Sequence, residues 1–352
     1  MMSSMQEAML KLLYTIPTPF YDARYMPESR HEISMLLELA KRNKVELLLL
    51  ESLNKTMSLP YSFKKRLTEL RKKRMEMAIT SYRIIDVLEK LGYKATTFKT
   101  WTPFPAVPND TDVIILDDIN TKEFRLLVQE LTNKHNYQIF DAIPYAVSIH
   151  DQRYSKHSNP KIKDPYDVDL YFEVAANRII YLNKRLLERH LREVFIGHEV
   201  IQLYTLTNEH ELLTQLIHCF LPEQIFLLYH YYIFLYSLDE INLQHFLEVA
   251  KEVHANHIIV FPLSITLNIL NIMRSYGKGS SICKVLYAVD EFLNRGYYRF
   301  KVQEIVLTIM DKARKDSVFR KSLMMQFASL TNVKTLLHVI AEIMTRRTRI
   351  TY

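Results

Sequence analysis

Apolar residues recur at helical spacing in the N-terminal part of this 352-residue chain. In residues 31–53, apolar side chains such as Ile33 and Leu37 fall on one face with good helix formers between them, which predicts one helix. Residues 61–93 predict a second, longer helix that ends at Gly92, because glycine suits the position just after a helix C-terminus.

After residue 93 the period of the pattern changes to two, and β-branched and aromatic residues become frequent. Three prolines in residues 102–110 exclude regular structure in that stretch. The predicted elements are strands at 94–101, 112–118, 145–151 and 166–174, a helix at 120–137 with Asn120 or Thr121 as its N-cap, and a polar loop at 155–165.

From about residue 180 to the C-terminus the pattern is helical again, with interruptions at Pro222, at Pro262 and at the turn sequence YGKGSS. We therefore predict an α+β protein that is predominantly α-helical. The predicted domains are an N-terminal helical region at 1–80, an α/β core with a small mixed sheet at 81–178, and a C-terminal helical domain at 179–352.

The two most apolar stretches, residues 224–238 and 257–273, are shorter than the roughly 20 residues that a helix needs to cross a bilayer. We predict that both are buried helices and that the protein has no membrane partner. The net charge of +7 favours a polyanionic ligand such as a nucleotide or RNA.

The composition is that of a soluble globular protein, with 48% hydrophobic and 24% charged residues. The two cysteines, Cys219 and Cys283, form no CxxC motif, and the N-terminus lacks the features of a signal peptide, so we predict a cytoplasmic location. The five glycines form neither GxGxxG nor GxxxxGK, which excludes a Rossmann dinucleotide site and a P-loop.

Paired carboxylates mark two of the predicted strands. In the sequence PNDTDVIILDD, Asp110 and Asp112 share one strand face, since successive side chains of an extended chain alternate. In YDVDLYFEV, Asp167 and Asp169 likewise share one face. If the two strands are neighbours, Asp110, Asp112 and Asp169 converge and can hold one or two magnesium or manganese ions for phosphoryl or nucleotidyl transfer.

Two alternatives stay open for these carboxylates. Asp110 and Asp112 form an Asp-x-Asp pair at the start of a strand, and such a pair is often a solvated strand end or turn cap rather than a metal site. Asp117 and Asp118, at the end of the same strand, are expected to be a solvated strand end. For the third ligand, both Asp167 and Asp169 qualify from the residues alone. In the Asp110, Asp112 and Asp169 set, Asp169 is also placed to orient or deprotonate an attacking hydroxyl.

The order of these motifs resembles the uncharacterised nucleotidyltransferase family of the DNA polymerase β-like nucleotidyltransferase superfamily. The matching segments are LLELAKRNKVELLLLESL, TFKTW, DTDVIIL, DVDLYFEV and LEVAKEVHANHIIVFPLSITLNIL, and they are distributed over most of the chain. The resemblance implies that residues 81–178 are a nucleotidyltransferase-like core, with a polymerase-β-like sheet flanked by helices. Its VDL motif matches Val168–Leu170 and so favours Asp169 over Asp167 as the third ligand. It also implies transfer of a nucleoside monophosphate from an NTP to an acceptor hydroxyl on RNA, a protein or a small molecule.

The sequence departs from the family pattern at two places. Where the superfamily has a Gly-Ser or similar small pair that cradles the triphosphate, this chain has Lys99 and Thr100, which become the expected nucleotide-binding residues. Tyr171 stands where the family often has histidine. These departures support the alternative function, a catalytically degenerate protein of the same fold that acts as a nucleic-acid-binding or protein-interaction scaffold.

The remaining polar features allow both a structural and a functional role. A basic run lies in the second predicted helix and is either a solvated face or an RNA-binding face; its members are Lys64, Lys65, Arg66, Arg71, Lys72, Lys73 and Arg74. His218 and His230 lie in apolar segments and are expected to be hydrogen-bonded core residues rather than metal ligands. We also expect that neutralising Asp110 and Asp112 together leaves the stability unchanged or raises it, because two like charges repel.

Overall fold

The computed structural model describes residues 4–16, 22–108, 110–154, 165–176, 179–188, 190–196, 201–276 and 287–329. Its α-helices are α1 (Ser4–Thr15), α2 (Arg30–Arg42), α3 (Glu46–Thr56), α4 (Tyr61–Lys90), α5 (Thr121–Lys134), α6 (Asn208–His218), α7 (Leu228–Ser237), α8 (Leu243–Glu252), α9 (Asn256–Tyr276), α10 (Tyr287–Arg295), α11 (Val302–Lys315) and α12 (Ser317–Ser329). A π-helix, η3 (Cys219–Glu223), directly continues α6. The strands are β1 (Ala95–Thr97), β2 (Thr111–Ile115), β3 (Tyr137–Ile143), β4 (Ala146–Asp151), β5 (Asp167–Tyr171), β6 (Val174–Ala176), β7 (Ile179–Leu182), β8 (Leu191–Ile196), β9 (Ile201–Leu206), β10 (Ile225–Phe226) and β11 (Tyr298–Arg299).

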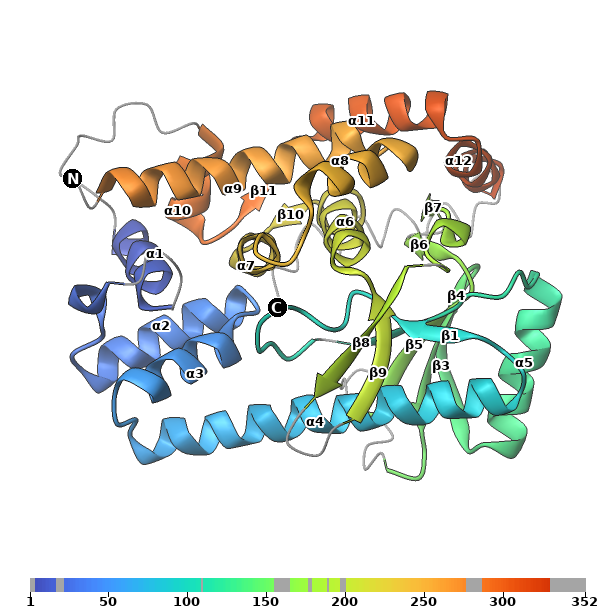
Figure 1. The fold of residues 1–352 in the computed structure, drawn as a ribbon, viewed down its shortest axis with the longest axis horizontal. Coiled ribbons are helices and arrows are strands. Elements are labelled where there is room, and N and C mark those ends of the chain that lie inside the picture. The colour runs from blue at the N-terminus through green and yellow to red at the C-terminus, as the bar shows by residue number, and fades with distance from the viewer. Residues whose placement is uncertain are drawn as a thin grey trace.

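A mixed sheet lies at the centre of the described part of the chain, with the strand order β3-β4-β5-β2-β1-β9-β8. β2 is antiparallel to β1 and parallel to β5, while β9 runs parallel to β1. Figure 1 shows α4 along one side of this sheet, α5 beside it, and the helices α6 to α12 on the opposite side. The α+β class and the predominance of helix that we expected are confirmed.

The two faces of the sheet pack into different cores, because side chains alternate along β2 and β5. Val113, Ile115, Val168 and Leu170 pack with residues of α4 and α5 in one core. Ile114 packs on the other face, in the core that includes Phe98 and residues of α6 and α7. Asp112 and Asp169 belong to this second face by the same alternation. The expected period of two in both strands is therefore confirmed, and the acidic face lies under the C-terminal helices.

The single helix predicted at 31–53 is wrong, because α2 and α3 are separate helices with a break at Asn43–Val45. Lys44 has a left-handed backbone there, with φ of 59°. Tertiary contacts stabilise the break: Leu228 N–H donates to Asn43 Oδ1 at 3.0 Å, and Lys44 Nζ lies 3.1 Å from Glu223 Oε1. These partners come from distant parts of the chain, so helical periodicity alone could not indicate them.

Local patterns predicted two other helices correctly. The helix α4 runs to Lys90, and Gly92 follows it with φ of 85°, a conformation that glycine adopts without a Cβ clash. Asn120 is the N-cap of α5, and it forms a capping box with Glu123. Both signals are local, which explains why sequence alone sufficed.

The helical prediction from residue 180 onward is wrong for its first part, since β7, β8 and β9 occupy much of 179–206. The β8–β9 hairpin extends the central sheet, where Thr205 pairs with Thr97 of β1. The strand β3, next to the predicted strand 145–151, was also missed. The predicted domain limits stay predictions, and residues 155–164 of the predicted polar loop lie outside the described residues.

The two most apolar stretches differ in burial. Nearly all of α7 is buried, as predicted for residues 224–238, but the first part of that predicted helix is wrong, because Ile225–Phe226 form β10. In contrast, α9 buries one side and exposes Val260 and Leu267 by 56% and 53%. By length and composition alone, its residues Asn256–Arg274 also meet the criteria for a membrane-crossing helix, and half of that window is buried within the described structure. The absence of a membrane partner stays a prediction.

Candidate functional site

The parallel pairing of β2 and β5 brings two of the predicted site residues together. Asp112 and Asp169 are direct partners in the register, so their side chains project from adjacent strands on the same face. Asp110 lies two residues before Asp112, and its charge adds to the effect of burial, which is the main cause of the raised pKa of Asp112. On the next strand, β4, Ser148 is the register partner of Asp169 and its hydroxyl donates a hydrogen bond to the Asp169 carboxylate.

Asp167 has a different partner from Asp169. Its Oδ1 lies 3.5 Å from His150 Nδ1, and the side chain is largely buried. The register therefore favours Asp169 over Asp167 as the companion of Asp112. Beyond the end of β2, Asp118 is exposed and pairs with Arg185, as expected for a solvated strand end.

Lys99 lies between β1 and the proline-containing segment, and its ammonium contacts Asp112. The distance from Lys99 Nζ to Asp112 Oδ1 is 3.3 Å, and the two side chains are 6% and 15% exposed. Burial lowers the pKa of Lys99, but Asp112, Tyr181 and Asp169 together raise it by more, so the pKa is raised overall and the ammonium stays charged. Burial raises the pKa of Asp112, and Lys99 opposes that rise.

Aromatic rings surround this ion pair. Lys99 Nζ lies 4.6 Å from the ring centroid of Phe98 and 5.0 Å from that of Tyr171, distances at which a ring face attracts a cation. Burial raises the pKa of Tyr181 to about 12, against the effect of Lys99, so this phenol is neutral near pH 7. The ammonium is thus placed among low-dielectric groups that strengthen its attraction to Asp112.

Thr100 contacts the backbone of β2. Its Oγ1 accepts a hydrogen bond of 2.9 Å from the Asp112 N–H, and the residue is 2% exposed. In this conformation Thr100 helps to fix the start of β2, and its predicted role in nucleotide binding, like that of Lys99, stays a prediction.

Helix α6 adds residues that the sequence analysis did not identify. Gln215 Nε2 donates to the Lys99 carbonyl at 2.7 Å and also to Glu211 Oε1 at 3.3 Å. Both side chains are almost fully buried. A Glu and a Gln four residues apart, with apolar residues such as Leu212 and Leu216 beside them, were the signal available in the sequence, since buried polar side chains need partners.

Glu211 should make the stability of the protein depend on pH. Burial raises its pKa to about 7, against the opposing effects of Gln215, Arg192 and Lys99. The unfolded chain releases this proton near pH 4.5, so the stabilisation is complete below that pH and is lost as the pH rises through 7. We expect urea unfolding to show a loss of about 3 kcal/mol between pH 4.5 and 8 in the wild type that Glu211→Gln lacks. An identical pH dependence in both proteins would contradict the assignment.

The donor set suits a magnesium ion that arrives with phosphates. Among the residues that the structure describes, no group of three His, Cys, Asp or Glu side chains is arranged to hold a metal ion by itself. Magnesium, however, is commonly bound by one or two carboxylates together with substrate phosphates, and Asp112 with Asp169 provides such a pair. The assignment of Asp110, Asp112 and Asp169 as catalytic residues and metal ligands stays a prediction.

Two histidines have the structural role that we expected. His230 Nδ1 accepts a hydrogen bond from the Leu227 N–H at 3.0 Å. The Nε2 atoms of His230 and His218 lie 3.5 Å and 3.8 Å from oxygens of Glu223, the carboxylate that also pairs with Lys44. Cys219, which lies in the same π-helix as Glu223, is buried. Cys283 lies outside the described residues.

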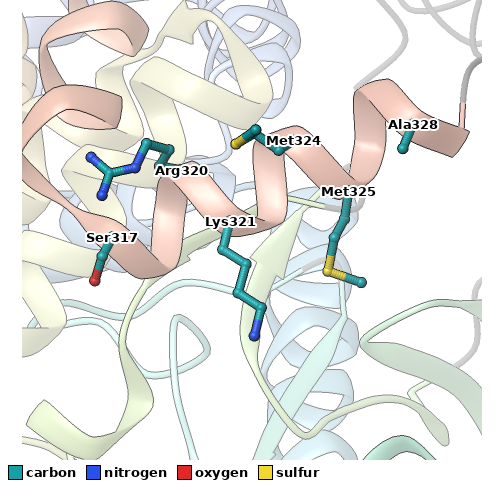
Figure 2. Close-up of a pocket in the computed structure, with 6 residues that line it drawn as sticks. All are labelled: Ser317, Arg320, Lys321, Met324, Met325 and Ala328. Carbon is teal, nitrogen blue, oxygen red and sulfur yellow. The ribbon is translucent and has the colours of Figure 1, made fainter.

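A shallow hollow lies on the outer side of α12, a helix that packs on β7 through a hydrogen bond from the Ile180 N–H to Ser322 Oγ. Figure 2 shows Lys321 and Met325 pointing to the same side of α12, one helical turn apart. The lining residues are Ser317, Arg320, Lys321, Met324, Met325 and Ala328. This set contains no carboxylate, so it offers no metal ligand comparable with Asp112.

No protein-family model and no curated protein matches this chain. Among solved structures, an antigenic nucleotidyltransferase-like protein from Paracoccidioides brasiliensis is similar over 60% of this chain and 96% of that chain, with 8% identity and a TM-score of 0.30. A similarity this weak carries no argument about fold or activity. The α+β architecture is established by the strands and helices of the chain itself, and its membership of the polymerase-β-like superfamily stays a prediction.

Proposed function

We propose that the protein transfers a nucleoside monophosphate from an NTP to an acceptor hydroxyl by metal-ion catalysis. The observation that carries this proposal is the parallel register of β2 and β5, because it sets Asp112 beside Asp169 on one face of the sheet. In this reaction the acceptor oxygen bonds to the α-phosphorus while the bond to the pyrophosphate leaving group breaks. The acceptor is a hydroxyl of RNA, a protein or a small molecule.

Each residue of the site has a role in this proposal. Asp110, Asp112 and Asp169 would hold magnesium or manganese together with the NTP phosphates, and the ion would neutralise phosphate charge. Asp169 would take the proton of the acceptor hydroxyl, and Ser148 would keep that carboxylate oriented through its hydrogen bond. Lys99 would donate hydrogen bonds to the phosphates.

The test is label transfer from radiolabelled NTP to an acceptor in cell extract, read on a gel in the presence of magnesium. The wild type should label an acceptor, and Asp169→Asn should reduce labelling by about 100- to 10,000-fold, as expected for the loss of a general base. Asp118→Asn is the matched control, because it removes an exposed carboxylate beyond the end of β2 and should leave labelling unchanged. Undiminished labelling by Asp169→Asn would overturn the proposal.

A catalytically degenerate scaffold is the second candidate, and the Lys99–Asp112 ion pair favours it, since this pair already neutralises one of the acidic residues. In that case the wild type transfers no label. If RNA is the partner, binding would depend on the basic run, of which Arg71 already pairs with Glu51 at 2.6 Å. Replacement of the exposed Lys64 and Lys65 by glutamine should then weaken RNA binding, measured by filter retention.

A further inference from the structure

We propose that Lys99 is the resident counter-cation of Asp112, so that a divalent cation can use Asp112 only after nucleotide phosphates have drawn the ammonium away. The inference rests on the proposed function for the identity of the phosphate ligand. The proposed function requires no particular order of binding, whereas the counter-cation role does: the metal ion binds Asp112 once phosphates are present and binds poorly on its own.

The first support is the contact itself. Lys99 Nζ lies 3.3 Å from Asp112 Oδ1, and both side chains are largely removed from solvent. A divalent ion needs the same carboxylate oxygens at about 2.0 to 2.1 Å, the magnesium distance. An ammonium and a divalent cation on one carboxylate repel each other, and this repulsion is strong where water does not screen it.

The second support is that the Lys99 backbone is held in an unfavourable conformation. Lys99 has φ of 59°, in the left-handed region that costs a non-glycine residue free energy. Such a conformation persists only where the surroundings enforce it, and Gln215 does so by donating to the Lys99 carbonyl at 2.7 Å. Helix α6 therefore positions the segment that follows β1 through this hydrogen bond, and in that position the Lys99 ammonium contacts Asp112.

The third support is that nucleotide phosphates provide alternative partners for the Lys99 ammonium. Nucleotide phosphates offer the ammonium several charge-assisted hydrogen bonds, which are stronger than those to neutral groups. Once the ammonium turns to them, the Asp112 carboxylate is no longer compensated by Lys99 and can bind a cation beside Asp169, its partner in the register. Phosphate binding and metal binding then favour each other. Bound phosphates remove the Lys99 ammonium that would repel the metal ion, and the bound metal ion neutralises phosphate charge that the carboxylates would repel.

The experiment measures the affinity for Mn²⁺ alone, from the free Mn²⁺ signal in electron paramagnetic resonance, in the absence of any nucleotide. Lys99→Met keeps the length of the side chain and removes its charge, and we expect it to bind Mn²⁺ roughly tenfold or more tightly than the wild type. Lys99→Gln is a second variant with the same expected direction. When Asp112→Asn is added to Lys99→Met, Mn²⁺ binding should become weak again. This result would show that the gain in Mn²⁺ affinity depends on Asp112.

The matched control is Lys312→Met, which breaks another buried pair, between Lys312 Nζ of α11 and Oδ2 of Asp316, the residue that follows this helix, at 2.9 Å. It should leave the Mn²⁺ affinity unchanged. In the otherwise wild-type protein, Asp112→Asn should also change it little, since Asp112 is already occupied by Lys99. Unchanged Mn²⁺ affinity in folded Lys99→Met, or a large loss of affinity in Asp112→Asn, would overturn the inference.

Failure of this inference is distinguishable from failure of the proposed function. Tight Mn²⁺ binding by Lys99→Met without label transfer by the wild type would support the counter-cation role and reject nucleotidyl transfer. Label transfer by the wild type with unchanged Mn²⁺ affinity in Lys99→Met would support the function and reject the counter-cation role.

Discussion

Replacing Asp112 with asparagine should destabilise the protein by about 3 to 5 kcal/mol, because it leaves the buried Lys99 ammonium without its counter-charge. The same change should reduce label transfer on the order of a thousandfold, since it removes a carboxylate proposed to hold the metal. The structure reverses the sequence-based expectation that neutralising Asp110 and Asp112 leaves stability unchanged or raises it. Repulsion between the two carboxylates is outweighed by the attraction of Asp112 to Lys99.

Urea unfolding of four proteins measures the coupling: the wild type, Asp112→Asn, Lys99→Met, and the double variant. The double variant should be more stable than the sum of the two single losses predicts, because it leaves no unpaired buried charge. Asp118→Asn, at an exposed ion pair, should change the free energy of unfolding by less than about 1 kcal/mol. Strictly additive losses would show that Lys99 and Asp112 do not interact.

Replacing Glu223 with glutamine should cost about 3 kcal/mol or more of stability, because Lys44 then lacks its buried partner. Burial raises the pKa of Glu223, but Lys44 and the neighbouring histidines together lower it by more than burial raises it, so the pKa lies well below its ordinary value. The carboxylate therefore stabilises the fold above the unfolded-state pKa near 4.5, and this stabilisation is lost as the pH falls through the lower native pKa.

Thermal and urea unfolding between pH 3 and 7 test this role. The wild type should lose stability toward acid pH more steeply than Glu223→Gln, and the two curves should approach each other at the lowest pH. Asp86→Asn is the control, since Asp86 pairs with Lys90 on the exposed surface of α4 and its loss should cost at most about 0.5 kcal/mol. Equal stability of Glu223→Gln and the wild type at pH 7 would show that the ion pair of Glu223 with Lys44 does not stabilise the break between α2 and α3.

Local sequence signals predicted the elements whose causes are local. The long helix α4 and its end before Gly92 follow from helical periodicity and from the tolerance of glycine for positive φ. The N-terminus of α5 follows from its capping box. The hairpin β8–β9 was not predicted, because its place in the sheet depends on pairing with β1, which lies about a hundred residues earlier in the chain.

The sequence by itself determined the α+β class and the alternation that puts Asp112 on one strand face, because both depend on residue type and on the period of the apolar pattern. Asp167 and Asp169 share one face by that period, so the register of β2 with β5 was needed to set Asp169 beside Asp112. Only the tertiary structure decided what neutralises Asp112. The ion pair with Lys99 requires a left-handed backbone at Lys99 and a hydrogen bond from Gln215, whose position in the chain is 116 residues away. No local pattern encodes such a partner, because electrostatic pairing depends on distance in space rather than distance along the chain.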